Sequence, residues 1–162
     1  MKKMALSVVL WLACLQALAN DNIRMVIVGD MMLAETVGQL MRLGGNPLQH
    51  VAHLFKGADI TIGNLETAVG THGQKALKPY TFLAHPRVIP FLTRHFSAVS
   101  LANNHSLDFG VPAFEAMLDA FDRQGLRYFG GGKNIRSAHE PAVFEIKGKR
   151  IAVLGYDIFQ PR

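Results

Sequence analysis

The chain has 162 residues, with 17 Lys or Arg against 12 Asp or Glu, which gives a formal net charge of +5. This modest positive charge is spread along the chain without runs, so it argues against a dedicated nucleic-acid-binding surface. Hydrophobic residues make up 49% of the chain, and its length is sufficient for one domain with a buried core.

The first 19 residues have the pattern of a secretory signal. Lys2 and Lys3 precede an apolar stretch over residues 4–15, and Ala17-Leu18-Ala19 provides a small-x-small cleavage site before Asn20. We therefore expect an exported protein, located in the periplasm or at the cell surface. An uncleaved N-terminal anchor is the alternative, although the apolar stretch is short for a membrane span.

Residues 20–162 are expected to form the mature protein. The only cysteine, Cys14, would leave with the signal, so the domain would be stabilised by its core and by any bound metal instead of disulfides. Lipidation of Cys14 is disfavoured because Trp11-Leu12-Ala13 is a poor lipobox. Residues 149–156 have the pattern of a buried strand, and the chain ends six residues later. We therefore expect residues 20–162 to be the N-terminal part of a longer domain.

Apolar runs and turn residues predict alternating strands and helices. Strands are expected at residues 24–29, 58–62, 97–101 and 126–129, and a hairpin at 142–146 and 150–155. Helices are expected at residues 36–43, 47–56, 85–95 and 111–124, the last of them capped by Gly125. Residues 71–78 are polar and contain glycine, so they should form a surface loop near the crevice.

Metal-type ligands follow three of the predicted strands. Asp30 ends the first, Asn64 and Glu66 follow the second, and Asn103-Asn104-His105 follows the third. Asp30 and Glu66 are 36 residues apart, and Glu66 and Asn104 are 38 apart, which is about the length of one strand–helix–strand unit. If the strands are parallel neighbours, the three clusters lie at one edge of the sheet. Together they would form a divalent-metal site.

Each cluster has a plainer interpretation. Asp30 could cap a helix instead of binding a metal. Asn64 could be a turn residue beside an exposed Glu66, although positions i and i+2 of an extended segment can approach one cation. The segment from Asn103 to Asp108 could be a hydrogen-bonded turn around one buried histidine. Its amide groups could also bind a cation while His105 protonates a leaving oxygen.

Two further motifs are weaker. His72 and His85 flank the polar loop and could contact substrate, whereas His139 could add a metal ligand. The glycine-rich segment Gly130-Gly131-Gly132-Lys133-Asn134 lacks the spacing of a phosphate-binding loop and the Ser or Thr that follows its lysine. We interpret this segment as a flexible turn.

Three stretches of the chain carry a family resemblance: Val28-Gly29-Asp30-Met31-Met32-Leu33, residues 57–67, and residues 100–110 with the core Ala102-Asn103-Asn104-His105-Ser106-Leu107-Asp108. Residues 130–141 and 151–156 add to it. With these motifs the chain resembles the CapA family, the capsule-synthesis proteins associated with poly-γ-glutamate. That family is related to the calcineurin-like metallophosphatases.

The resemblance implies an α/β metallophosphatase-like fold, an α/β/β/α sandwich that would be truncated at its C-terminus here. It also implies a centre of two divalent metal ions, of the Mn, Zn, Mg or Fe type. Asp30 would bind the first ion, Glu66 would bridge, Asn104 would bind the second, and His105 would act on the leaving group. Four more side chains would contact substrate or support these ligands: Asn64, Asn103, Asp108 and His85.

Two departures from the superfamily pattern bear on activity. Metallophosphatases usually carry a histidine two residues after the first aspartate, where this chain has Met32. They also take further histidine ligands from a C-terminal half. The first functional hypothesis is a metal-dependent hydrolase of phosphoesters, or of amides in a γ-linked polymer. The alternatives are a non-catalytic module, which binds anionic polyglutamate or membrane proteins of capsule synthesis, and an inactive fragment.

Overall fold

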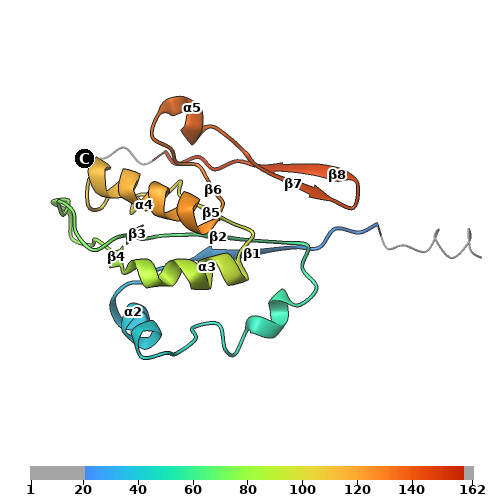
Figure 1. The fold of residues 1–162 in the computed structure, drawn as a ribbon, viewed down its shortest axis with the longest axis horizontal. Helices are drawn as coiled ribbons and strands as arrows, with labels where there is room; N and C mark the ends of the chain where they lie inside the picture. The colour runs from blue at the N-terminus through green and yellow to red at the C-terminus, as the bar shows by residue number, and fades with distance from the viewer. Residues whose placement is uncertain (1–20, 159–162) are drawn as a thin grey trace, which may run out of the picture.

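The computed structural model describes residues 21–158, so the predicted signal lies outside the described residues and stays a prediction. The chain forms a mixed α/β domain, which confirms the expected fold class (Figure 1). The strands are β1 (Met25–Asp30), β2 (Ile60–Asn64), β3 (Ala68–Val69), β4 (Leu83–Ala84), β5 (Ala98–Ser100), β6 (Tyr128–Phe129), β7 (Ala142–Ile146) and β8 (Lys149–Val153). The α-helices are α2 (Glu35–Arg42), α3 (Ile89–His95), α4 (Val111–Gln124) and α5 (Ile135–Ala138), and the 3₁₀ helices are η1 (Ala52–Phe55) and η2 (Pro86–Val88).

The main sheet is parallel throughout, in the order β1-β2-β5-β6. Its register places Asp30 opposite Asn64 and Asn64 opposite Ser100, so β1, β2 and β5 end at the same level. Because all of them run in one direction, the segments that follow them emerge at one edge of the sheet. This arrangement confirms the predicted convergence of the three strand ends.

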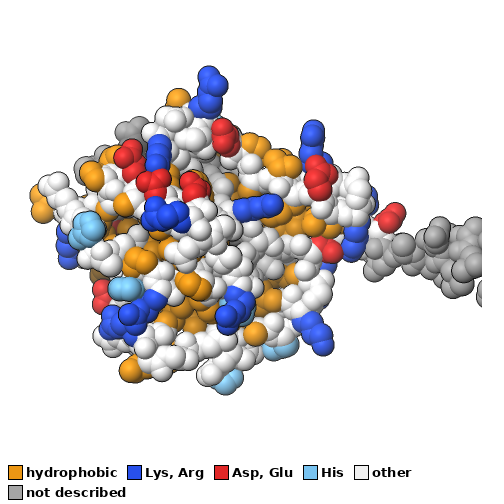
Figure 2. All heavy atoms as spheres, viewed as in Figure 1, with side chains coloured by type: hydrophobic (Ala, Val, Ile, Leu, Met, Phe, Trp, Pro, Cys, Tyr) orange, Lys and Arg blue, Asp and Glu red, His pale blue; other side chains and the backbone are white. Residues whose placement is uncertain are grey.

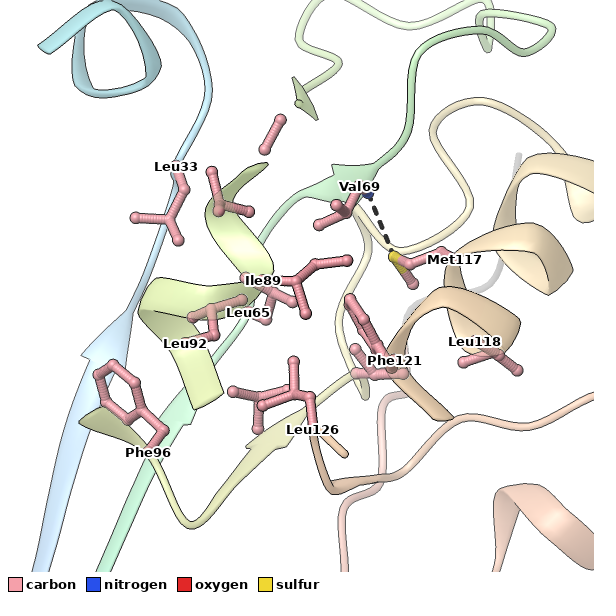
Figure 3. Packing of buried hydrophobic residues seen from close by; sticks show 14 of the residues in the cluster. Leu33, Leu65, Val69, Ile89, Leu92, Phe96, Met117, Leu118, Phe121 and Leu126 are labelled. Carbon is pink, nitrogen blue, oxygen red and sulfur yellow. Dashed lines mark hydrogen bonds between the residues drawn. The ribbon is translucent and has the colours of Figure 1, made fainter. Parts of the chain in front are cut away.

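One face of the sheet is covered by α2, α3 and α4 (Figure 1). Figure 3 shows Ile89 and Leu92 of α3 facing Met117 and Phe121 of α4 across the cluster; the backbone N–H of Val69 donates a hydrogen bond of 3.2 Å to the sulfur of Met117. Helix α4 has the predicted bounds, and Gly125 caps it with a φ of +68°. Glycine adopts this left-handed conformation without steric cost, which explains the helix end.

The other face of the sheet packs against the β7–β8 hairpin. Ile60, Ile62 and Ala98 of the sheet contact Ala142 and Phe144 of β7. The hairpin was predicted, but β8 does not form the buried strand that we expected at residues 149–156. It ends at Val153, and its residues alternate between half-buried and exposed because only one face of the hairpin touches the sheet. An apolar run cannot distinguish this arrangement from burial on both faces.

The helix predicted at residues 47–56 was wrong. Residues 47–51 form turns, and only the short η1 follows them. The side chain of Asn46 accepts a hydrogen bond of 2.9 Å from the backbone N–H of Leu48, and such an Asx turn competes with helix formation. The sequence also gave no indication of β3, β4 and α5, which are too short to show a hydrophobic period. Over residues 21–158, no helix is both long enough and apolar enough to cross a bilayer.

Candidate functional site

Hydrogen bonds connect the three strand ends. The amide nitrogen of Asn64 donates to Asp30 Oδ1 at 2.8 Å, and the amide nitrogen of Asn103 donates to Asn64 Oδ1 at 2.9 Å. The Asn103 nitrogen also donates to the backbone oxygen of Leu65 at 3.0 Å. Asp30 does not cap α2, because the residue at the N-cap is Ala34. The edge of the sheet therefore brings Asp30, Asn64 and Asn103 together.

The residues after β5 form a compact hydrogen-bonded turn. The Ser106 hydroxyl donates to the backbone oxygen of Leu101 at 2.6 Å, and the backbone N–H of His105 donates to Asn103 Oδ1 at 2.9 Å. These bonds hold the turn against the end of the strand. This arrangement confirms the plainer interpretation of the segment as a hydrogen-bonded turn around one buried histidine, and its functional interpretation stays a prediction.

His105 lies between two acidic side chains. Its Nδ1 is 2.8 Å from Asp108 Oδ2, and its Nε2 is 3.9 Å from Glu66 Oε1. The ring is stacked on Phe82, with the centroids 4.5 Å apart and the planes inclined by 35°. Asp108 is completely buried and His105 is only 8% exposed. A histidine with one nitrogen on a buried carboxylate has the other free to exchange a proton.

The pKa of Glu66 is raised above its ordinary value. Partial burial is the main cause, followed by the nearby Asp30 carboxylate; Asp108 adds a smaller effect in the same direction, whereas His105 lowers the pKa. Two neighbouring carboxylates repel each other, and a bound cation would relieve this repulsion.

The structure also assigns neighbours that the sequence did not reveal. The Lys78 ammonium forms an ion pair with Asp108 Oδ1, which has no aligned hydrogen bond, and it donates to the backbone oxygen of Asn104 at 2.6 Å. The backbone N–H of Phe82 donates to Asp108 Oδ2 at 2.7 Å. A buried aspartate predicts that a cation is near, but the sequence does not show which residue of a long loop supplies it.

Other predicted residues lie outside this network. The Asn104 side chain is exposed, and its backbone rather than its amide makes the contact with Lys78. His85 caps η2 and accepts hydrogen bonds from Arg87. His139 contacts Tyr156, with the ring centroids 5.6 Å apart. Met32, at the position where the resemblance implied a histidine in metallophosphatases, packs against the helix-side core.

The donor set fits a hard cation only in part. Among residues 21–158, no group of three or more His, Cys, Asp or Glu side chains could hold a metal ion. Asp30 and Glu66 offer two carboxylates and Asn64 an amide oxygen, which are ligands that Mg²⁺ or Mn²⁺ prefers. These residues fit one cation that keeps several waters, while a second ion would need ligands from elsewhere.

The fold and this edge define an α/β protein with a parallel sheet and a cluster of carboxylate, amide and imidazole groups at its carboxyl end. A family of proteins described as "Bacterial capsule synthesis protein PGA_cap" matches residues 24–161. The chain belongs to this family, and the predicted CapA resemblance is confirmed.

Curated relatives support the assignment. The chain is 28% identical over 144 residues to the capsule biosynthesis protein CapA of Bacillus anthracis, and 26% identical over 144 residues to the PGA biosynthesis protein CapA of Bacillus subtilis. These matches cover 85% of the chain but only 35% and 38% of the relatives. The chain is also 32% identical over 99 residues to a probable polyglutamine synthesis accessory protein of Mycobacterium tuberculosis. That match covers 60% of the chain and 26% of the relative. The chain thus spans about a third of the length of the two CapA proteins.

Proposed function

We propose that the chain contributes one half of a metal-dependent hydrolase site that acts in capsule polyglutamate synthesis or processing, in the periplasm or at the cell surface. The observation that carries the proposal is the carboxylate pair of Asp30 and Glu66 beside an imidazole held by a buried aspartate. Family membership supports the capsule context. The bond cleaved would be a phosphoester or an amide of a γ-linked polymer.

The residues of this chain suit proton transfer. Asp108 fixes the imidazole of His105 through Nδ1, which leaves Nε2 on the side of Glu66. A protonated Nε2 can donate to a leaving oxygen or nitrogen, and a neutral one can accept a proton from a nucleophile. Phe82 covers one face of the ring and so keeps water from that side.

Asp30 and Glu66, with Asn64 or Asn104, would hold a divalent cation at this edge. When bound, the cation supplies a Lewis acid and lowers the pKa of a water molecule. The pKa of Glu66 is raised partly by Asp30, which is the state expected of a ligand pair without its cation. The other ligands of a two-metal centre would correspond to residues in the part of the relatives that lies outside the matched region.

A second candidate function is a binding module for anionic polyglutamate or for a membrane protein of capsule synthesis. No group of three or more metal-binding side chains lies within the described range, which favours this alternative. The surface also offers basic groups. Figure 2 shows Lys, Arg and His side chains with few acidic ones in the lower part of the face, over α2 and α3. The last turns of these helices contain Arg42, Arg94 and His95. An anionic chain would be attracted to such a surface.

The two functions can be separated with the purified chain. We would measure Mn²⁺ binding by calorimetry, hydrolysis of bis-p-nitrophenyl phosphate and of γ-glutamyl oligomers with and without Mn²⁺, and binding of poly-γ-glutamate. The hydrolase proposal predicts metal-dependent turnover that is lost in Glu66→Ala and His105→Gln. Polymer binding that persists without metal and without turnover would favour the binding module.

Matched variants make this comparison specific. Glu66→Ala and Asp30→Ala should each lower the bound metal measured by elemental analysis. Glu145→Ala, an exposed change on the distant β7, should leave it unchanged. If neither site variant changes the metal content, the ligand assignment is wrong even if the protein binds metal.

A further inference from the structure

We propose that Lys78 is a positioning residue of this site. Through its ion pair with Asp108 it would hold the buried carboxylate with Oδ2 turned toward His105, which favours the tautomer with a proton on Nδ1 and a bare Nε2 facing Glu66. The functional value of this role rests on the proposed hydrolase site. The tautomer itself does not depend on metal or on turnover.

The loop that carries Lys78 is attached to the His105 turn at several points. The backbone N–H groups of Gln74 and Ala76 donate to the backbone oxygens of Phe109 and Asp108 at 3.0 and 2.8 Å. Farther along the loop, the backbone N–H of Phe82 reaches Asp108 Oδ2. Residues 74–82, which we call the strap, therefore follow the turn from one side. The predicted surface loop near the crevice therefore also contacts the turn that carries His105.

Asp108 needs a partner of opposite charge. Its side chain has no exposed surface, and burial of an isolated carboxylate is strongly unfavourable. The Lys78 ammonium is the positive group paired with Asp108 Oδ1. Because the Lys78 side chain is 29% exposed, the strap places this positive charge between the buried carboxylate and the solvent. Asp108 Oδ2 then accepts from the backbone of Phe82 and faces His105 Nδ1.

The contacts of the Asp108 carboxylate determine which nitrogen of His105 carries the proton. A carboxylate only accepts hydrogen bonds, so Nδ1 at 2.8 Å must be the donor. In the neutral imidazole Nε2 is then unprotonated, on the side of Glu66. Without Lys78 the carboxylate could turn away from Nδ1, and the preference for this tautomer would weaken. Lys78 would thus determine the direction in which His105 can exchange a proton.

Lys78 also fixes the peptide after Asn103. Its ammonium donates to the backbone oxygen of Asn104 at 2.6 Å, at the start of the turn that carries His105. One side chain therefore connects the strap, the buried aspartate and the backbone of a proposed ligand. Lys75, in the same strap, is exposed and offers a matched control for the loss of one positive charge.

The test is an NMR measurement on the metal-free chain. Long-range ¹H–¹⁵N spectra at pH 9 distinguish protonated from bare ring nitrogens, and the His105 signals are assigned by their loss in His105→Gln. In the wild type we expect the Nδ1–H form to exceed the Nε2–H form at least about tenfold, because a hydrogen bond to a charged group favours it. Lys78→Met should reduce this ratio at least about threefold, Lys78→Arg should largely restore it, and Lys75→Met should leave it unchanged.

Three results would overturn the proposal. The first is an Nε2–H form in the wild type, a result that needs no variant and so stands even if Lys78→Met fails to fold. The second is a folded Lys78→Met with an unchanged ratio. The third is an equal fall in Lys75→Met, which would indicate a general charge effect of the strap. Since no metal or substrate is added, loss of the hydrolase proposal would not change any of these readings.

Discussion

Substitution of Asp108 by asparagine tests the energetic importance of the buried charge. Asp108 is completely buried, and its carboxylate meets Lys78, His105 and the backbone of Phe82. Asparagine has nearly the same shape and can still accept hydrogen bonds, so it leaves no cavity. It does remove the charge, and its amide NH₂ would face the Lys78 ammonium in one of its two orientations.

The expected loss of stability can be worked out from these contacts. Two charge-assisted hydrogen bonds become neutral, and each costs about 1 kcal/mol. Loss of one partner of a buried ion pair costs about 3–5 kcal/mol in total, and the 29% exposure of Lys78 places this case at the lower end because the ammonium can turn to water. We therefore expect Asp108→Asn to lower the free energy of unfolding by about 3 kcal/mol. A domain with about 5–15 kcal/mol of stability should remain folded.

Urea unfolding followed by far-ultraviolet circular dichroism measures this change. With a slope of about 2 kcal/mol per molar urea, the midpoint should fall by about 1.5 M. Asp119→Asn is the control, because Asp119 pairs with Lys133 at the surface, where both side chains are 46% exposed, and its loss should have little effect. Equal small shifts for both variants would refute the argument that burial makes the Asp108 charge important.

Three other predictions concern separate features of the fold. Gly125→Ala should destabilise the protein by about 1 kcal/mol in urea unfolding, because the φ of Gly125 is +68°. A Cβ there would meet no atom within 4 Å, so the loss would come from the backbone conformation alone. An unchanged stability would show that the backbone relaxes. Burial, followed by the charge of Asp122, raises the pKa of Tyr128 to about 12. Ultraviolet titration should therefore show a phenol that ionises late, and this step should disappear in Tyr128→Phe. The stability that depends on the protonated phenol should be lost as the pH rises from 10 through 12. Because the pKa of Glu66 is raised, Glu66→Gln should raise the Tm of the metal-free protein at pH 7.5. The gain should vanish well below about pH 4, where Glu66 is protonated in the folded and unfolded states alike. A gain that persists at low pH would contradict this cause.

The central strands and their common edge could be predicted because the local patterns are strong. The continuous apolar run at Met25–Val28 suits a sheet strand, and the spacing of Asp30, Glu66 and Asn104 matches parallel units. Helix α4 was predicted to the residue because its 3.6-residue period and Gly125 agree. Each of these features depends on residues close in sequence, or on a regular repeat of strand and helix.

The strap and its contacts could not be predicted, because they depend on tertiary packing. β3 and β4 have two residues each and pair only because the chain folds back over residues 70–82. Lys78 reaches Asp108 across 30 positions of sequence, and the sequence does not distinguish it from Lys75, which lies in the same polar loop and is exposed. The helix expected at residues 47–56 failed for the opposite reason, since the local turn at Asn46 overrides the apolar spacing.

We propose that Asp30, Glu66 and the His105 turn bind one cation at the carboxyl edge of the sheet. Paramagnetic line broadening by Mn²⁺, recorded in ¹H–¹⁵N spectra with Mg²⁺ as the diamagnetic reference, would locate this cation. We expect substoichiometric Mn²⁺ to broaden the amide signals of residues 29–31, 64–67 and 103–106 first, and Glu66→Gln to abolish this pattern. Broadening that is centred on the β7–β8 hairpin or spread over exposed acidic residues, and unchanged in Glu66→Gln, would contradict the claim.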